Sequence, residues 1–105
     1  MIDLRSDTVT RPTDAMLDAM MSAKVGDDVY GEDEAVNALQ QTAADFFGME
    51  SALFCPSGTM TNQIGIRGHV HPGVEGSCHE RAHGYLHEGG GCASIAGCSV
   101  RLIGG

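Results

Sequence analysis

The sequence CHERAHGYLHEGGG occupies residues 78–91 and lies between two segments that are predicted to be strands. It contains three histidines, His79, His83 and His87, spaced four residues apart. Side chains at positions i and i+4 share one face of a helix, so a helical conformation would point the three imidazoles in the same direction. This pattern is compatible with two kinds of site: a metal site, and a cofactor pocket that an imidazole lines.

The metal interpretation depends on residues 79–83, which match the zinc motif H-E-x-x-H. The motif requires a helix and a third ligand within reach. His87 continues the spacing, but the extended pattern H-E-x-x-H-x-x-G-x-x-H does not occur in the sequence. A zinc hydrolase is therefore kept as an alternative function, and no residue is predicted to be a metal ligand.

The segments on either side of residues 78–91 predict an α/β fold. Residues 74–78 and 99–103 are predicted strands, the second because its apolar residues alternate with polar ones. Residues 51–55 are a third short apolar run and a third predicted strand. Strands that alternate with helical segments are typical of a parallel sheet with flanking helices. In such sheets ligands bind beyond the carboxyl ends of the strands, and His83 follows one of these ends.

A turn of small residues, Ser57-Gly58-Thr59, follows the predicted strand at residues 51–55 and precedes a helix that is predicted to start near Met60. The backbone N–H groups at the start of a helix attract anions. Gly58 allows the backbone to come close to a ligand, and the hydroxyls of Ser57 and Thr59 can donate hydrogen bonds to phosphate oxygens. No lysine follows the turn, so it is not a Walker-type phosphate loop.

Two helices are predicted in the first half of the chain. Thr13 is a suitable N-cap for a helix that ends before Gly26, and Asp33 is suitable for a helix that runs to about Phe47 and ends at Gly48. The residues between the two helices are rich in glycine and acidic side chains, which predicts a loop.

The chain has 105 residues, which is enough for one small domain. We expect an extended arm over residues 1–12 and an α/β segment over residues 13–105, both parts of one incomplete domain.

The net charge of −8 comes entirely from residues 1–50, and an acidic chain repels nucleic-acid backbones. No apolar run approaches the length of about 20 residues that a membrane helix needs. Four cysteines without a C-x-x-C pair, and no apolar signal core, predict a cytoplasmic protein with reduced thiols.

Several segments together resemble the low-specificity L-threonine aldolases. The similar segments, in chain order, are residues 4–12, 25–33, 53–62, 82–85 and 88–91. The resemblance implies a pyridoxal 5'-phosphate-dependent lyase, and the chain would be the N-terminal part of the large domain of the fold-type-I pyridoxal-phosphate enzymes. The expected reaction is the cleavage of a 3-hydroxy amino acid, such as threonine or allo-threonine, to glycine and an aldehyde. Another pyridoxal-phosphate lyase or a transaminase of the same fold is the main alternative.

The resemblance also implies roles for individual residues. The turn Ser57–Thr59 would hold the cofactor phosphate, and His83 would lie on the pyridine ring and assist proton transfer at the substrate hydroxyl. Ser6 would bind the substrate carboxylate, and Tyr30 would belong to a loop that lines the pocket of a neighbouring subunit. His87 stands where the family often has an aromatic ring, so it would contact the substrate side chain.

The family's cofactor-binding lysine is expected beyond residue 105. Lys24 is the only lysine in the chain, and it does not match the position of that lysine. Residues 1–105 alone are therefore expected to be inactive. The resemblance further implies a homo-oligomer, a tetramer built from dimers.

Overall fold

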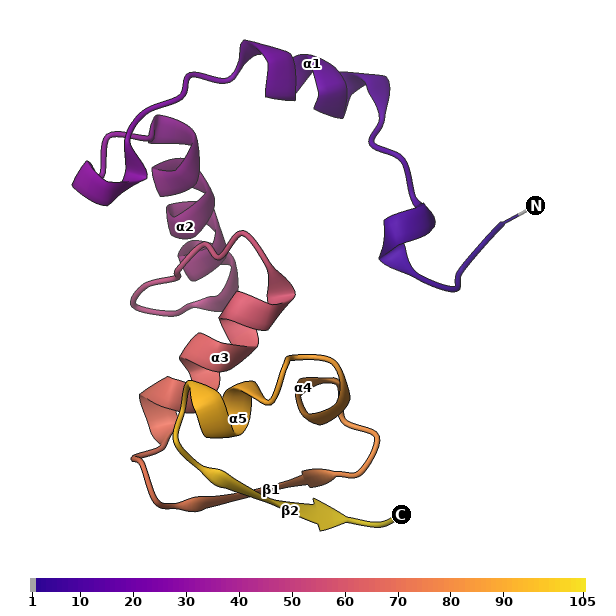
Figure 1. Ribbon diagram of the computed structural model, residues 1–105. Coiled ribbons are helices and arrows are strands. Elements are labelled where there is room, and N and C mark those ends of the chain that lie inside the picture. Colours follow the sequence, from indigo (N-terminus) through magenta and orange to yellow (C-terminus); the bar gives the residue numbers. More distant parts are fainter. Residues whose placement is uncertain (1) are drawn as a thin grey trace. The chain divides into compact units, whose positions relative to one another are not determined.

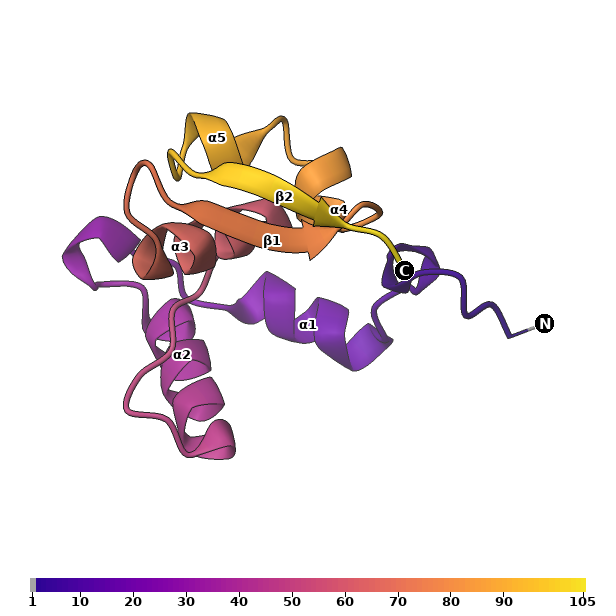
Figure 2. The same ribbon diagram turned by 90° about the horizontal axis from the view of Figure 1, so that it is seen from below.

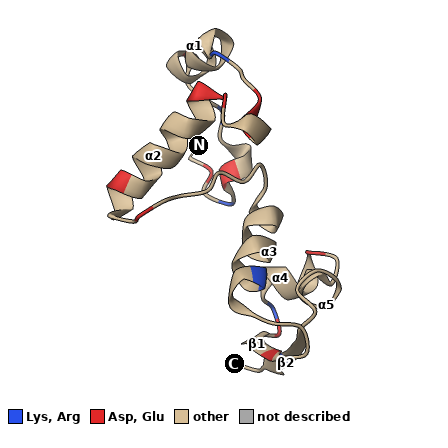
Figure 3. Cartoon of the chain, turned by 90° about the vertical axis from the view of Figure 1, so that its left-hand side faces the viewer, with Lys and Arg blue, Asp and Glu red and all other residues tan. Residues whose placement is uncertain are grey.

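The computed structural model describes residues 2–105 (Figure 1). The contacts between Cα atoms divide the chain into two compact units, which meet in sequence between Phe54 and Cys55. Each unit is described by itself. Figure 3 shows that the acidic residues are concentrated in the first unit, as the sequence requires. Within the described residues, every helix is too short or too polar to cross a membrane.

Over residues 2–54, the regular elements of the first unit are all helical. In chain order these are the 3-10 helix η1 (Asp7–Val9), α1 (Asp14–Ser22), the 3-10 helix η2 (Asp28–Tyr30) and α2 (Glu34–Phe47). Both α-helices begin at the predicted caps. The Thr13 hydroxyl accepts a hydrogen bond from the Met16 N–H, and the Asp33 carboxylate accepts one from the Val36 N–H.

Asp33 also fixes the loop that precedes α2. Its carboxylate accepts hydrogen bonds from the N–H groups of Val36, at 2.9 Å, and Gly26, at 3.1 Å. These bonds stabilise the ionised form and lower the pKa of Asp33. At the other end of α2, Gly48 has a φ of 63°, and its N–H bonds to the carbonyls of Ala44 and Asp45. This left-handed conformation explains why a glycine ends the helix.

Two predictions for the first unit are wrong. Residues 1–12 are not extended throughout, because the Ser6 hydroxyl accepts a hydrogen bond from the Thr8 N–H and caps the turn of η1. Residues 51–55 are not a strand. A strand needs a neighbour for its backbone hydrogen bonds, whereas the Phe54 N–H donates to the side-chain oxygen of Gln40 at 2.9 Å.

The second unit is an α/β structure, as predicted. Its elements are α3 (Gly58–His69), β1 (Glu75–His79), α4 (His83–Leu86), α5 (Gly91–Ser94) and β2 (Ser99–Ile103). β1 and β2 are parallel, with Glu75 opposite Ser99 and His79 opposite Ile103. The two short helices α4 and α5 form the crossover between the strands, and Figure 1 shows α3, α4 and α5 on the same side of the sheet. The strands run side by side in Figure 2 as well.

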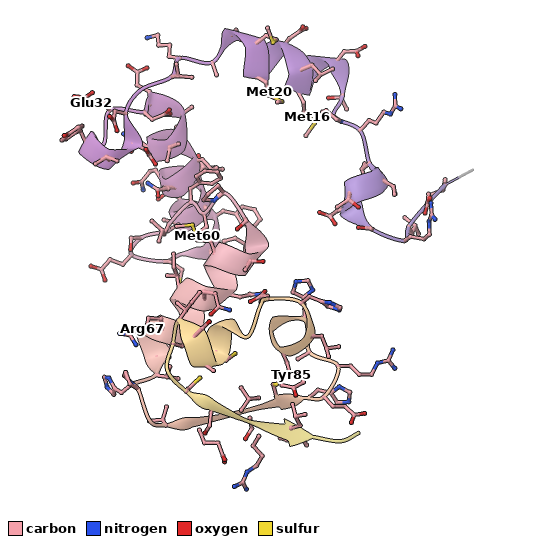
Figure 4. All side chains as sticks on the ribbon, in the orientation of Figure 1. Met16, Met20, Glu32, Met60, Arg67 and Tyr85 are labelled. Carbon is pink, nitrogen blue, oxygen red and sulfur yellow. The ribbon has the colours of Figure 1, made fainter. Side chains whose placement is uncertain are left out.

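Helix α3 is attached to the crossover by polar side chains. Arg67, labelled in Figure 4, donates a hydrogen bond to the carbonyl of Ala96 at 3.2 Å. Closer to the start of the helix, Asn62 and Gln63 donate to the carboxylate of Glu88. The buried residues of this unit include Gln63 and Glu88 beside Ala96 and Cys98, so polar contacts hold much of its interior together.

Gly48 provides a test of the helix-ending conformation. We expect Gly48→Ala to lower the free energy of unfolding by about 1–2 kcal/mol, because a Cβ disfavours the left-handed region. Gly65→Ala is the matched control: it lies inside α3 with nothing within 4 Å of the added Cβ, and should raise stability by about 0.5–1 kcal/mol. Urea denaturation followed by circular dichroism measures both. Equal changes in the free energy of unfolding for the two substitutions would contradict the left-handed conformation of Gly48.

Candidate active site

A buried carboxylate lies at the centre of the second unit. The side chain of Glu88 has no solvent-accessible surface. Its Oε1 accepts a hydrogen bond from Asn62 Nδ2 at 2.6 Å, and its Oε2 accepts one from Gln63 Nε2 at 2.7 Å. Removing a carboxylate from water is costly unless hydrogen bonds replace the hydration, and short bonds to an ionised acceptor are among the stronger ones. The two amides of α3 supply these bonds.

The hydrogen bonds also determine the charge of Glu88. The amide of Asn62 contributes most to lowering the pKa of this carboxyl, and the amide of Gln63 contributes next. Burial acts in the opposite direction, and a smaller lowering comes from His83. The net effect is a lowered pKa, so Glu88 is a carboxylate at neutral pH.

His83 lies beside this carboxylate at the start of α4. Its Nε2 atom is 3.7 Å from Glu88 Oε1, which is within the distance of an ion pair. The side chain of His83 is 66% exposed, so one part of the imidazole faces Glu88 while the rest is open to a ligand. The ring of His87 is tilted against it, with 5.2 Å between the ring centres and an angle of 53°. The structure therefore places an exposed imidazole between a buried anion and a second ring.

The start of α3 has the properties of an anion site. Ser57 caps the helix by accepting a hydrogen bond from the Met60 N–H at 3.2 Å, which leaves its own hydroxyl proton free to donate. In residues 2–105 the N–H groups of Gly58 and Thr59 have no acceptor, as is usual for the first turn of a helix. An added Cβ at Gly58 would meet open space, so a ligand can approach the backbone there. A phosphate group, such as that of the cofactor implied by the resemblance, fits these donors.

The anion site and His83 belong to the same unit and are connected by hydrogen bonds. Asn62 lies about one turn beyond the start of α3, and it donates to Glu88, which in turn faces His83. The hypothesis that the turn Ser57–Thr59 and His83 bind one ligand is compatible with this connection. The individual roles of these residues, and that of His87, stay predictions.

Ser6 and Tyr30 lie in the first unit. The Ser6 hydroxyl is occupied locally, since it accepts from the Thr8 N–H at 3.2 Å and lies 2.9 Å from the Thr8 hydroxyl. Tyr30 ends η2 and is exposed. Their predicted contacts with substrate and with a neighbouring subunit are not tested by these positions.

The helix required by the zinc motif does not form. His79 is the last residue of β1, whereas His83 begins α4, so the two side chains do not share a helix face. The Nδ1 atom of His79 accepts a hydrogen bond from the Arg81 N–H at 3.0 Å, which holds the ring in the turn. No group of three potential ligands that could hold a metal is found in the part of the chain that the structure describes. The condition for aligning the three imidazoles, a single helix that includes all three histidines, is not met.

The sequence interpretation missed Glu88, Asn62 and Gln63 as site residues. Glu88 lies in residues 78–91, the segment with the three histidines, but its partners Gln63 and Asn62 precede it by 25 and 26 residues. A single sequence contains no signal for a hydrogen bond across such a separation. The available hint was a carboxylate close to the predicted catalytic histidine.

The second unit is an α/β structure with free N–H groups at the start of α3 and a buried carboxylate next to an exposed imidazole. The family model described as "Beta-eliminating lyase" matches residues 3–105. The chain belongs to the beta-eliminating lyase family.

Relatives confirm the resemblance to low-specificity L-threonine aldolases. The chain is 57% identical to the "Low specificity L-threonine aldolase" of Escherichia coli K12 over 103 residues, which are 98% of this chain and 31% of that protein. It is 48% identical to the enzyme of that name from Saccharomyces cerevisiae over 99 residues, 93% of this chain and 26% of that protein. The Arabidopsis thaliana "Low-specificity L-threonine aldolase 1" is also 48% identical, over 97% of this chain and 29% of that protein. The chain spans about a third of the length of these relatives.

Gly91 provides a test of the packing around the buried amide. A Cβ added at Gly91 would lie 2.4 Å from the side-chain amide carbon of Gln63. We expect Gly91→Ala to lower the free energy of unfolding by about 1–3 kcal/mol, because Gln63 is buried and must shift. At Gly84 an added Cβ meets only ordinary contacts at 3.7 Å, so Gly84→Ala should change stability by less than about 0.5 kcal/mol. Thermal denaturation of both variants checks the expectation, and equal stability of the two would contradict it.

The lowered pKa of Glu88 predicts a loss of stability in acid. The carboxyl has an ordinary pKa of 4.5 in the unfolded chain and a lower one in the folded chain. Its stabilising contribution is therefore complete above pH 4.5 and is lost as the pH falls through the folded pKa. Below pH 4.5, the stability of Glu88→Gln should decrease less steeply than that of the unchanged protein.

The Glu88→Gln variant is expected to fold. A glutamine at position 88 can bond with both amides after one of them rotates, and the buried Oε1 of Gln63 has no partner in the present structure. Urea denaturation between pH 3 and 7 measures the two slopes. Identical slopes would show that Glu88 is not held ionised by its neighbours.

Proposed function

We propose that a protein with this chain as its N-terminal part is an L-threonine aldolase that uses pyridoxal 5'-phosphate. The substrate is a 3-hydroxy amino acid, threonine or allo-threonine, which is cleaved to glycine and an aldehyde. The identity of 42–57% with relatives of that name, over nearly the whole chain, carries this proposal. The site is compatible with it, since a helix start with free N–H groups and an exposed imidazole lie in one α/β unit.

The residues present fit part of the cofactor. The Ser57 hydroxyl and the N–H groups of Gly58 and Thr59 would hold its phosphate at the start of α3, and the exposed ring of His83 would lie against its pyridine ring. The lysine that binds the cofactor covalently would come from beyond residue 105, because Lys24 does not match the position of that lysine in the family that the chain resembles. In this proposal the chain is the first part of a fold-type-I large domain.

His83 performs the proton transfer in the proposed reaction. Its imidazole accepts the proton of the substrate β-hydroxyl, and the O–H electron pair becomes the second bond of the aldehyde carbonyl. The Cα–Cβ bond breaks, its electron pair stays with the glycine portion, and a proton added at Cα completes glycine. Bound pyridoxal phosphate supplies the delocalisation of that electron pair. A histidine is suited to this role because it exchanges protons near neutral pH.

The remaining proposed contacts concern the substrate and the assembly. Ser6 binds the substrate carboxylate, His87 contacts the side chain of the substrate, and Tyr30 lines the pocket of a neighbouring subunit in a dimer-based tetramer. Exposed apolar side chains on α1 and α2, among them Met21 and Phe46, support association between subunits. A cytoplasmic location is supported by the four cysteines, which are all unpaired.

A different pyridoxal-phosphate lyase or a transaminase of the same fold is the alternative. The family description favours a lyase. The residues that distinguish the substrates of these enzymes are expected beyond residue 105, so activity measurements must separate them.

The proposed function predicts that the natural protein, supplied with pyridoxal phosphate, releases glycine and acetaldehyde from threonine or allo-threonine. His83→Asn should lower kcat by about 10²–10⁴-fold, because it removes the positioned acid–base group. Glu80→Gln is the control: Glu80 is an exposed neighbour of His83 in sequence, and its replacement should leave kcat unchanged. A natural protein that binds the cofactor but releases no glycine from either substrate would contradict the proposal.

The same assay applied to residues 1–105 alone should detect no turnover, since the covalent lysine would be missing. Turnover by these residues would show that the expected position of the lysine is wrong.

A further inference from the structure

The most isolated charged group in the second unit is the carboxylate of Glu88. It has no access to solvent, and hydrogen bonds from Asn62 and Gln63 fix both of its oxygens. Neither bond has a role in the proposed proton transfer by His83. Yet Oε1, the oxygen bonded to Asn62, is also the oxygen that faces Nε2 of His83, at 3.7 Å.

This arrangement bears on which ring nitrogen of His83 carries the proton. A neutral imidazole has one N–H donor and one acceptor nitrogen, and the group facing one nitrogen selects the tautomer. Glu88 is an ionised acceptor and cannot donate, so it favours a proton on the nitrogen it faces, which is Nε2. The lone pair is then left on Nδ1, and the amides of Asn62 and Gln63 prevent Glu88 from turning away.

We propose that Glu88 is the positioning residue for His83: its carboxylate keeps a proton on Nε2 and leaves Nδ1 as the atom that receives the substrate hydroxyl proton. When Nδ1 takes that proton the ring becomes a cation, and the same carboxylate stabilises it through their ion pair. The receiving role of Nδ1 rests on the proposed function, whereas the selection of the tautomer depends only on the contacts of Glu88.

A double substitution can replace the hydrogen-bond acceptor that faces Nε2 of His83 by a donor, while the net charge of residues 62 and 88 stays the same. In the double variant Asn62→Asp with Glu88→Gln, the new aspartate can only accept, so Nε2 of the glutamine must donate to it. The glutamine Oε1 still accepts from Gln63 Nε2, and both hydrogen bonds of the site are retained. The group that faces Nε2 of His83 is now an N–H donor, which favours a proton on Nδ1 instead.

The experiment is ¹⁵N NMR of the natural protein labelled at histidine, without added cofactor, at about pH 8, where an ordinary histidine is neutral. A His83→Asn sample identifies the His83 signals among those of the other histidines of the protein. We expect the Nε2–H tautomer of His83 in the unchanged protein and in the control Glu80→Gln, and the Nδ1–H tautomer in the double variant. With cofactor and threonine, the double variant should lose at least about 10²-fold in kcat with little change in its melting temperature.

Two results would overturn the inference. One is the Nδ1–H tautomer in the unchanged protein, a measurement that needs no variant and is valid even if the double variant fails to fold. The other is a folded double variant that keeps the Nε2–H tautomer. A failure of the proposed function gives a different result: the unchanged protein would show the Nε2–H tautomer of His83 but would release no glycine from threonine or allo-threonine.

Discussion

The second unit depends on the burial of one carboxylate. Glu88 lies within the crossover between the two strands, and its hydrogen bonds with Asn62 and Gln63 fasten that crossover to α3. The bonds also meet the requirement that a buried charge be solvated by the protein. Few apolar side chains of this unit are buried, so directed polar contacts rather than a large apolar core determine how its helices are arranged.

The same interaction connects structure with chemistry. Helix α3 offers free N–H groups at its start and the two amides about one turn further on, and the crossover offers Glu88 and His83. Because Glu88 is bonded to α3, the carboxylate that faces the His83 imidazole is fixed relative to the start of that helix. The proposed acid–base role of His83 requires a fixed geometry, and a buried, fully bonded carboxylate beside it is compatible with that requirement.

Much of the local structure follows from short-range rules. The caps Thr13 and Asp33, the glycine end of α2 at Gly48 and the parallel strands around residues 78–91 were all predicted. The strand at residues 51–55 was predicted wrongly, because an apolar run becomes a strand only when a neighbour accepts its backbone hydrogen bonds. A helix that includes all three histidines does not form for a similar reason: His79 pairs in the sheet with Ile103, a partner 24 positions away.

The sequence by itself determined the family, the α/β class of the second unit and the identity of the candidate phosphate and imidazole residues, because these depend on local patterns and on resemblance. Only the tertiary structure decided that Glu88 is buried, that Asn62 and Gln63 hold it, and that its Oε1 faces His83. The physical reason is that a buried charge is stabilised by whichever donors the fold brings to it. Those donors come from a helix that is distant in sequence, and no local pattern encodes the meeting.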